Sequence, residues 1–255
     1  MTVQPGSLGF SFPDAGDPQQ PADVAIVMPT VLRPVIVRAI ASIYQQNFQG
    51  RIQILIGVDK PLGPLEPLLE LLARRPSHVS ALVLQLPWST SARHGGMHTA
   101  IDTGALRTIL SYMVNSRAVA YLDDDNILLD DHLRLLHAAL QGKAWSWSQR
   151  MLVDERNDRD LAVDRWDSVG PDRGRMASQG GFVDTNCLML DKVLCSPILG
   201  RWAESGQGKP GLTADRHLFA ALRRAPYGRV EKATVRYYIR PTNILHQFMQ
   251  IGQEF

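Results

Sequence analysis

The stretch AVAYLDDDNILLDDHL (residues 118–133) contains an apolar run, three consecutive aspartates and the start of a second apolar pattern. The first run predicts a buried strand that ends at the aspartates. Asp123, Asp124 and Asp125 repel one another unless a positive charge compensates them. Successive side chains of an extended strand point to opposite sides, so Asp123 and Asp125 would face together and offer oxygen ligands to Mg²⁺ or Mn²⁺. The alternative is a solvated turn in which Asp124 or Asn126 acts as a cap.

Outward from this stretch, apolar runs alternate with amphipathic ones. The predicted elements, strand then helix in turn, are residues 24–29, 34–46, 52–59, 64–75, 79–87 and 103–114. Continuous apolar strands separated by helices indicate a parallel sheet covered on both faces. The carboxyl ends of such strands share one edge, which is where ligands bind. Asp59 and the aspartate run both fall at this edge.

The second half of the chain is less regular. It predicts strands at 144–153, 180–191 and 230–241, helices at 132–140 and 213–224, and a long charged loop at 154–175. Asp130 is the expected N-cap of the helix at 132–140, and Gly142 is its expected terminator. Trp145 and Trp147 are expected in the core. Residues 1–22 are expected to be a flexible leader, followed by a single domain over 23–255.

Composition excludes several classes of protein. With 45% apolar and 20% charged residues, the 255-residue chain is typical of a soluble globular protein. Its net charge of +2 gives no reason to expect nucleic-acid binding. Cys187 and Cys195 are too few for a four-ligand zinc site, and two glycines between His94 and His98 oppose a helical zinc pair. Without a visible signal peptide or membrane span, a cytoplasmic protein is expected.

The order and separation of these motifs resemble the family 2 glycosyltransferases, which have the GT-A fold. The resemblance covers residues 23–250 and depends on VAIVMPTVLRPVIVRAIASIYQQ, IQILIGVDKP, YLDDDNILLDDHL and TADRHLFAALRR. It implies an α/β fold with a mixed, mainly parallel central sheet. It also implies a metal-dependent inverting enzyme that uses a nucleoside-diphosphate sugar, with UDP expected as the nucleotide and Mn²⁺ or Mg²⁺ as the cofactor.

The resemblance assigns roles residue by residue. Asp215 would be the catalytic base, while Asp125 and His246 would ligate the metal ion. The residues that would bind the nucleotide sugar are Thr30, Asp59, Arg93, Asp123, Asp124, Gly180 and Gly181. Departures from the family pattern are Lys60, where a second acid is common, and Ala214, where a glutamate usually precedes the base.

Several of these assignments have a simpler alternative. Asp215 could be a first-turn acid that the helix dipole favours. Asp59 could cap a turn, Arg93 could be solvated, and His246 could be an ordinary surface or core histidine. Trp166 and Trp202 could line a sugar pocket, although core packing is favoured for both.

Two other functions remain open at this point: a nucleotidyltransferase on a similar sheet, and a non-catalytic protein that binds sugar nucleotides. The sequence does not identify the donor sugar, the acceptor or the oligomeric state. It leaves open a peripheral contact with a membrane, because acceptors in the family are often lipid-linked.

Overall fold

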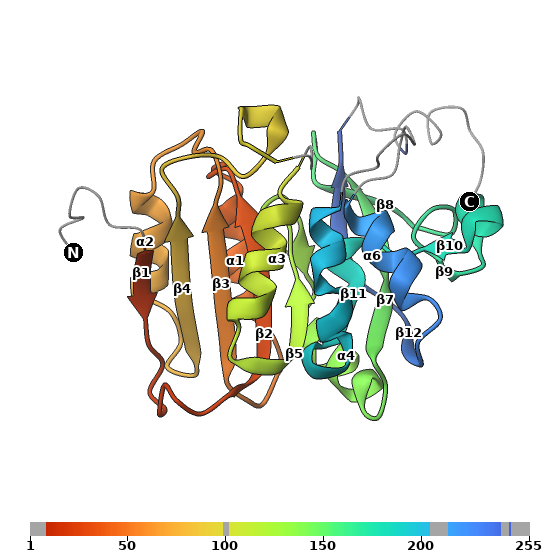
Figure 1. Cartoon of the computed structure of the whole chain (residues 1–255), viewed down its shortest axis with the longest axis horizontal. Coiled ribbons are helices and arrows are strands. Elements are labelled where there is room, and N and C mark those ends of the chain that lie inside the picture. The colour runs from red at the N-terminus through yellow and green to blue at the C-terminus, as the bar shows by residue number, and fades with distance from the viewer. Residues whose placement is uncertain (1–8, 99–101, 205–213, 241–244, 246–255) are drawn as a thin grey trace.

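The apolar runs of the sequence form the strands of one mixed sheet (Figure 1). The computed structural model describes residues 9–98, 102–204, 214–240 and 245. The strands are β1 (Gly9–Phe12), β2 (Ala22–Thr30), β3 (Ile52–Val58), β4 (Val79–Gln85), β5 (Ser116–Tyr121), β6 (Ile127–Leu128), β7 (Trp145–Asp154), β8 (Arg159–Val163), β9 (Gly170–Pro171), β10 (Gly181–Phe182), β11 (Leu188–Asp191) and β12 (Tyr227–Ile239). Their order in the main sheet is β1-β4-β3-β2-β5-β11-β7-β12-β6, with β8 paired to β7, while β9 and β10 form a separate ribbon.

Strand direction decides which ends meet. β2, β3, β4 and β5 are parallel neighbours, and β7 is parallel to β12. β11 lies antiparallel between β5 and β7, so β7 and β12 run in the same direction as the first four. The carboxyl ends of these six strands therefore lie along one edge, the upper edge in Figure 1. β11 begins at this edge, which brings the residues before it to the same place.

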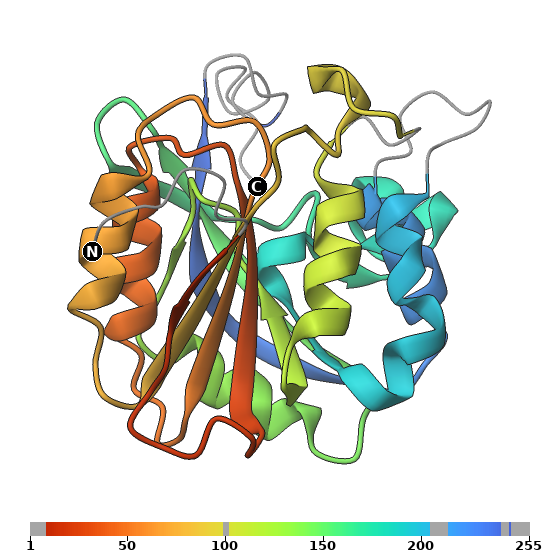
Figure 2. The same ribbon diagram turned by 60° about the vertical axis from the view of Figure 1, so that its left-hand side comes forward.

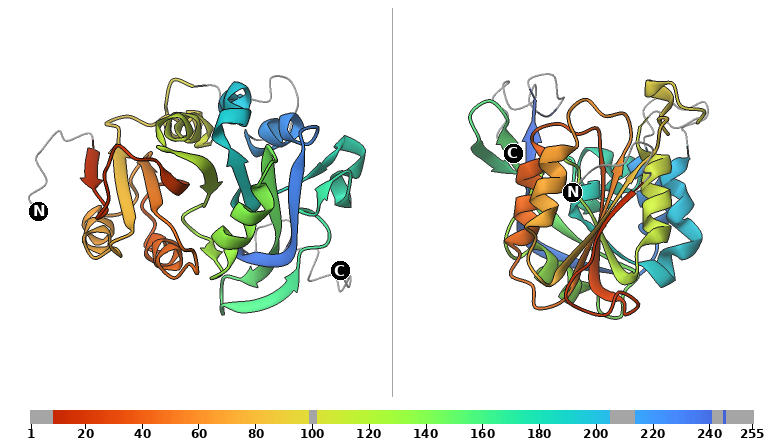
Figure 3. Two further views of the ribbon diagram at one scale, coloured as in Figure 1. Left: turned by 90° about the horizontal axis from the view of Figure 1, so that it is seen from below. Right: turned by 90° about the vertical axis from the view of Figure 1, so that its left-hand side faces the viewer.

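Helices cover both faces of the sheet, as the alternating sequence pattern predicts. They are α1 (Ile36–Tyr44), α2 (Glu66–Ala73), α3 (Gly104–Met113), α4 (His132–Leu140), α5 (Lys192–Cys195) and α6 (Ala214–Leu222), with short 3-10 helices η1 (Ala92–His94), η2 (Gly174–Gln179), η3 (Thr185–Cys187) and η4 (Ser196–Ala203). Figures 2 and 3 show α1 and α2 on one face and α3, η4 and α6 on the other. α4 lies on the α1 side, where the rings of Phe48 and His137 meet edge to face at 5.5 Å.

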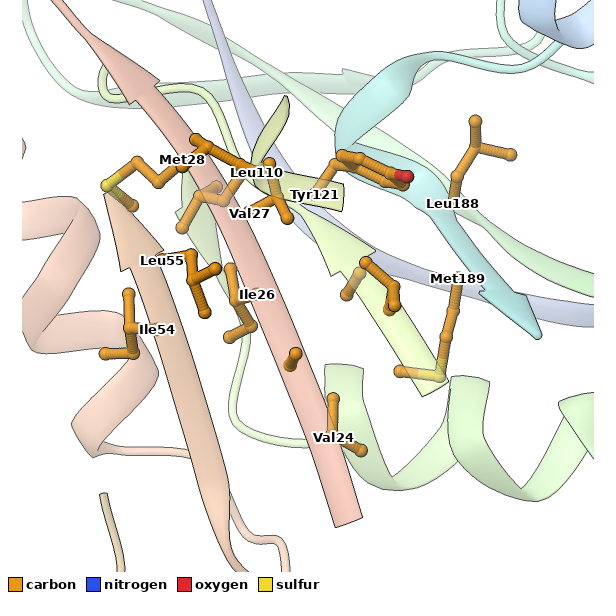
Figure 4. Packing of buried hydrophobic residues seen from close by; sticks show 14 of the residues in the cluster. Val24, Ile26, Val27, Met28, Ile54, Leu55, Leu110, Tyr121, Leu188 and Met189 are labelled. Atoms are coloured by element: carbon orange, nitrogen blue, oxygen red, sulfur yellow. The ribbon is translucent and has the colours of Figure 1, made fainter. Parts of the chain in front are cut away.

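The core lies on both sides of β2, β3 and β5. Their side chains are almost entirely buried because each of these strands has a neighbour on both sides and helices above and below. Residues from β2, β3, β5, α3 and β11 pack together in Figure 4, where the labelled side chains are Val24, Ile26, Val27, Met28, Ile54, Leu55, Leu110, Tyr121, Leu188 and Met189. Ile36, Ile40 and Ile43 of α1 share a buried face, as the 3.6-residue spacing predicts.

Three of the four tryptophans that were expected in the core are fully buried. Trp145 and Trp147 are buried on β7, as predicted. Trp202, for which a sugar contact was the alternative, is also fully buried. Trp166 is only partly buried, and the guanidinium of Arg175 lies 4.8 Å from its ring.

Three local predictions are wrong. Part of the expected flexible leader is ordered, because Gly9–Phe12 pairs with β4 as an edge strand. The expected loop at 154–175 contains β8, which forms a hairpin with β7. The expected strand at 180–191 is interrupted by η3, so that only its two ends are strands.

The start of α4 also differs from the prediction by one residue. Asp131, and not Asp130, occupies the N-cap position, and its side chain makes no capping hydrogen bond there. It pairs instead with Arg134 and Lys232. Gly142 has a φ of 69°, in keeping with its predicted role after the helix end. Across the described ranges, every helix is too short or too polar to cross a membrane.

Candidate active site

A pocket of about 410 Å³ opens at the carboxyl edge of the sheet. It lies between the end of β2, the loop after β5 and the end of β12. Its lining residues are Pro29, Thr30, Val31, Arg33, Thr103, Asp123, Asp124, Asp125, Asn126, Tyr237, Tyr238 and Arg240. All three consecutive aspartates therefore reach one cavity at the edge where ligand binding was predicted.

The aspartates form a turn rather than the end of a strand. β5 ends at Tyr121, and the backbone N–H of Asn126 donates to the carbonyl of Asp123 over 3.2 Å. The predicted alternation, with Asp123 and Asp125 on one side and Asp124 on the other, therefore does not apply. Each aspartate has different partners instead.

A strained turn after β2 directs an arginine into the pocket. Leu32 has a φ of 59°, which is unfavourable for a residue with a Cβ atom, and its side chain is buried. The Leu32 N–H donates to the hydroxyl of Thr30 over 2.8 Å. This conformation, which costs about 1 kcal/mol or more, places Arg33 directly against the aspartates.

Asp124 is the buried member of the run, with 2% of its surface exposed. The hydroxyl of Thr30 donates to one of its oxygens over 2.6 Å, and Arg33 pairs with the other. Thr30 and Asp124, both predicted to bind a nucleotide, thus contact each other at the floor of the pocket. A carboxylate buried this deeply requires such partners.

Asp125 lines the pocket with 23% of its side chain exposed. Arg33 donates to its Oδ2 atom over 2.9 Å, and Arg240, directly after β12, donates to the same oxygen over 3.3 Å. Burial raises the pKa of the Asp125 carboxyl and the charge of Asp123 raises it further, while Arg33 opposes the shift. Burial and a neighbouring carboxylate thus both disfavour the charged form of Asp125, and the arginines paired with it offset this.

Asp123 is held from two sides. Arg107 of α3 pairs with one of its oxygens, and the side-chain amide of Asn186 donates to the other over 3.0 Å. The side-chain oxygen of Asn186, Oδ1, accepts in turn from the backbone N–H of Asp123 over 2.6 Å. Among the described residues the charges that compensate these aspartates are arginines, and the divalent cation that the sequence suggested stays a prediction.

A second buried cluster supports Asn186 from behind. Asp184 accepts from the backbone and side-chain N–H groups of Asn186 over 3.0 and 2.8 Å. It also accepts from Arg150 over 2.7 Å, and Arg150 donates further to Asp164 and Asp167 over 2.9 Å each. Arg150 is 1% exposed. A continuous set of hydrogen bonds therefore runs from this cluster to the pocket.

The Asn186 contacts give a testable prediction. Asn186→Ala should lower the free energy of unfolding by about 2 kcal/mol, because the Asp123 N–H loses its acceptor and the carboxylates of Asp123 and Asp184 each lose one donor. Chemical denaturation would measure the loss. The matched control is Asn157→Ala at an exposed turn, where a change within about 0.5 kcal/mol is expected. Equal losses in the two variants would contradict the prediction.

Asp215, the expected base, lies in the first turn of α6 and is partly buried. The start of α6 packs closely against Gly104 of α3. A Cβ atom at this glycine would lie 1.9 Å from the carbonyl oxygen of Trp202 and 3.0 Å from Cβ of Ala214. Only glycine permits this approach of α3 to η4 and α6. The contact brings the start of α6 next to the helix that carries Arg107.

Arg107 is a shared counter-charge for several carboxylates. Burial disfavours its charge, yet Asp123, Asp215 and Asp102 together hold the pKa of Arg107 above its ordinary value. Burial raises the pKa of Asp102, whereas Arg107 lowers it. The expected base thus belongs to the same electrostatic cluster as the aspartate run, although it does not line the 410 Å³ pocket.

Other predicted residues lie away from the pocket lining. The Asp59 carboxylate is inaccessible because it accepts from Ser89 over 2.8 Å, from the N–H of Thr90 over 2.6 Å, and faces Nδ1 of His94 at 3.1 Å. It therefore anchors the segment around η1, on which Arg93 is exposed. The nucleotide-binding roles of Asp59 and Arg93 stay predictions.

Gly180 and Gly181 have backbone roles in this structure. Their φ values are 95° and 80°, and a Cβ atom on Gly181 would lie 2.1 Å from the carbonyl oxygen of Gly170. Both support the turn from η2 into β10. Their expected approach to a donor sugar stays a prediction, and His246 lies outside the described residues.

Four residues that the motifs did not single out line or support the pocket: Arg33, Arg107, Asn186 and Arg240. Arg33 and Arg240 each follow a strand that ends at the binding edge, which is the signal that had drawn attention to Asp59. Arg107 lies within a helix, and Asn186 lies within what the sequence presented as one strand. Nothing local marks these two.

Comparison with solved structures identifies the architecture. The structure of Staphylococcus aureus TarS superimposes with a TM-score of 0.63 at 13% identity, covering 90% of this chain and 38% of that one. The chain has the fold of TarS. TarS 1–349 in complex with UDP gives a TM-score of 0.62 over 86% of this chain, and its complex with UDP-GlcNAc gives 0.63 over 88%, both at 13% identity.

The mixed α/β fold predicted from the sequence, that of GT-A proteins, is confirmed by the likeness to TarS. The chain covers 61% and 60% of TarS 1–349 in the two complexes, which is less than two thirds of its length. No protein-family model and no curated protein sequence matches this chain.

The carboxylate oxygens of the pocket are compatible with a divalent cation that is also bound by the phosphates of a ligand. Among the residues that the structure describes, no three His, Cys, Asp or Glu side chains gather as a complete metal site. Asp123 and Asp125 nevertheless present carboxylate oxygens to a cavity, and both side chains are partly exposed. Mg²⁺ and similar ions are commonly held by one or two carboxylates together with substrate phosphates. The residues therefore fit such an ion only together with a phosphate-bearing ligand.

Proposed function

We propose that this chain is a glycosyltransferase that moves a sugar from a nucleoside-diphosphate donor, with UDP as the nucleotide, to an acceptor hydroxyl with inversion. The observation that carries the proposal is the carboxylate-lined pocket at the carboxyl edge of β2 and β5. Support comes from the fold, which is that of TarS, a protein whose structures include UDP and UDP-GlcNAc complexes.

The pocket would bind the diphosphate end of the donor. Asp125, with Asp123 beside it, would hold a divalent cation. That ion would neutralise the negative charge that develops on the departing nucleoside diphosphate. Thr30 and Asp124 form the floor of the pocket through their 2.6 Å hydrogen bond. Tyr237 and Tyr238 line its other side.

Asp215 would accept the proton of the acceptor hydroxyl as that oxygen attacks the sugar carbon. The charge of Asp215 is one of those that hold the pKa of Arg107 above its ordinary value, which places this carboxylate in the same cluster as Asp123. One base opposite the leaving group implies a single displacement and hence inversion.

Donor binding tests the proposal. UDP with Mn²⁺ should raise the melting temperature of the wild-type protein, because a ligand that binds only the folded state stabilises it. Asp125→Ala should weaken binding of UDP in the presence of Mn²⁺ by at least about tenfold, the loss typical even of residues that only support a metal ligand. Thermal shift and calorimetry with different nucleoside diphosphates would measure both effects and show the base preference.

Reaction products separate the proposal from its alternatives. A glycosyltransferase releases the nucleoside diphosphate, whereas a nucleotidyltransferase releases pyrophosphate. Stabilisation by UDP without turnover or donor hydrolysis would indicate a binding protein. Absence of any UDP binding by the wild-type chain would contradict the proposed function.

A further inference from the structure

Two arginines of the pocket converge on one oxygen atom. Arg33 and Arg240 both donate to Oδ2 of Asp125, over 2.9 and 3.3 Å. They come from opposite sides of the cavity, Arg33 from the turn after β2 and Arg240 from the end of β12. Both guanidinium groups therefore pair with the carboxylate that is proposed to hold the cation, and both use the same oxygen of it.

Each arginine has a second carboxylate partner. Arg33 also pairs with Asp124, and Nε of Arg240 lies 3.4 Å from Glu155. The side chains are 29% and 47% exposed, so both reach the solvent-accessible part of the cavity. Arg107 differs, because it is buried beneath Asp123 with 10% of its side chain exposed.

The stability of the fold does not explain the Arg240 contact. Ion pairs between such exposed groups contribute little to folding, because solvent screens them. A guanidinium group, by contrast, matches the geometry of phosphate oxygens and binds them through paired hydrogen bonds. Arg33 and Arg240 both line the cavity that would receive the diphosphate.

We propose that Arg33 and Arg240 form an exchange pair: they neutralise Asp125 while the pocket has no ligand, and they bind the donor diphosphate once a cation takes their place on Asp125. This inference rests on the proposed function and adds phosphate-binding residues to it. It requires the cation and the nucleotide to bind together. The cation alone must compete with two arginines, and the nucleotide alone meets arginines that are engaged with Asp125.

The exchange predicts opposite effects of one substitution on two ligands. In Arg240→Gln, Mn²⁺ alone should bind about threefold more tightly, a small gain because the lost pair is exposed. UDP in the presence of saturating Mn²⁺ should bind about tenfold more weakly, because a charged hydrogen-bonding partner of the phosphate is lost. Titration calorimetry with Mn²⁺, with UDP and with both would give the affinities. Arg240→Lys, which keeps the charge without the planar donors, should restore part of the UDP affinity.

The matched control is Arg156→Gln. Arg156 is an exposed arginine at the β7–β8 turn, is paired with Asp154 and lies outside the pocket lining. This variant should leave both affinities unchanged. A misfolded variant would bind both ligands more weakly. Only tighter binding of Mn²⁺ together with weaker binding of UDP therefore supports the exchange.

Three results would overturn the inference. They are unchanged UDP affinity in Arg240→Gln, weaker Mn²⁺ binding in the same variant, and wild-type protein that binds Mn²⁺ equally well with and without UDP. If wild-type protein binds UDP and any of these is found, the exchange fails and the proposed function stands. If wild-type protein does not bind UDP at all, both fail.

Discussion

Asp215→Asn should bind a UDP-sugar donor as tightly as the wild-type protein and transfer the sugar about a thousandfold more slowly, the scale of a lost general base. Asparagine keeps the size of the side chain and its backbone contact, in which the Asp215 carboxylate accepts from the Arg216 N–H over 2.8 Å. It cannot accept a proton from the acceptor. Single-turnover transfer rates, measured beside donor affinity by calorimetry, separate the two effects.

The control is Asp160→Asn on β8, where the aspartate is 53% exposed, pairs with Arg236 and is outside the pocket lining. Its transfer rate should match that of the wild-type protein. If Asp215→Asn transfers sugar at the wild-type rate, the base lies elsewhere. Asp102 is then the next candidate, because it belongs to the same cluster around Arg107 and burial raises its pKa.

The sheet could be predicted from sequence because its signal is local. The apolar runs that became β2, β3, β4 and β5 are uninterrupted, and each is followed by a helix with a clear buried face. The placement of the aspartate run at the binding edge followed from that pattern alone. The second half was harder, because β11 runs antiparallel between two parallel groups and no local pattern encodes strand direction.

The charges of the site could not be paired from sequence. Arg33 lies 92 positions from Asp125, and Arg240 lies 115 positions from it. Their contact depends on the strand order, in which β5, β11 and β7 lie between β2 and β12. An acidic run therefore indicated that a positive charge was needed but did not distinguish an ion from arginines. The same limitation hid Asn186, which reaches Asp123 only because η3 interrupts the predicted strand.

Arg150→Met should have the largest effect on folding. Arg150 is buried and donates to Asp164, Asp167 and Asp184, and its guanidinium lies 4.0 Å from the ring centre of Tyr237. Methionine fills most of the volume but leaves buried carboxylates without their shared counter-charge. We expect the free energy of unfolding to fall by about 4 kcal/mol, the scale for breaking a buried ion pair from one side. Urea or guanidinium denaturation would measure it.

The loss should be electrostatic rather than steric, and pH distinguishes the two. Burial raises the pKa of Asp184 to about 6 even though Arg150 opposes the shift. Without Arg150 this pKa would rise further above the value in the unfolded chain, so the destabilisation is fullest above the raised value and shrinks as the pH falls through it. Adding Asp184→Asn to Arg150→Met should recover part of the stability, because one uncompensated charge is removed. Arg117→Met is the control, since Arg117 is 68% exposed where it pairs with Asp191. A loss in Arg150→Met that matches this control, or that is independent of pH, would mean that the three carboxylates do not depend on Arg150. In that case Asn186 could not derive its position from the buried cluster.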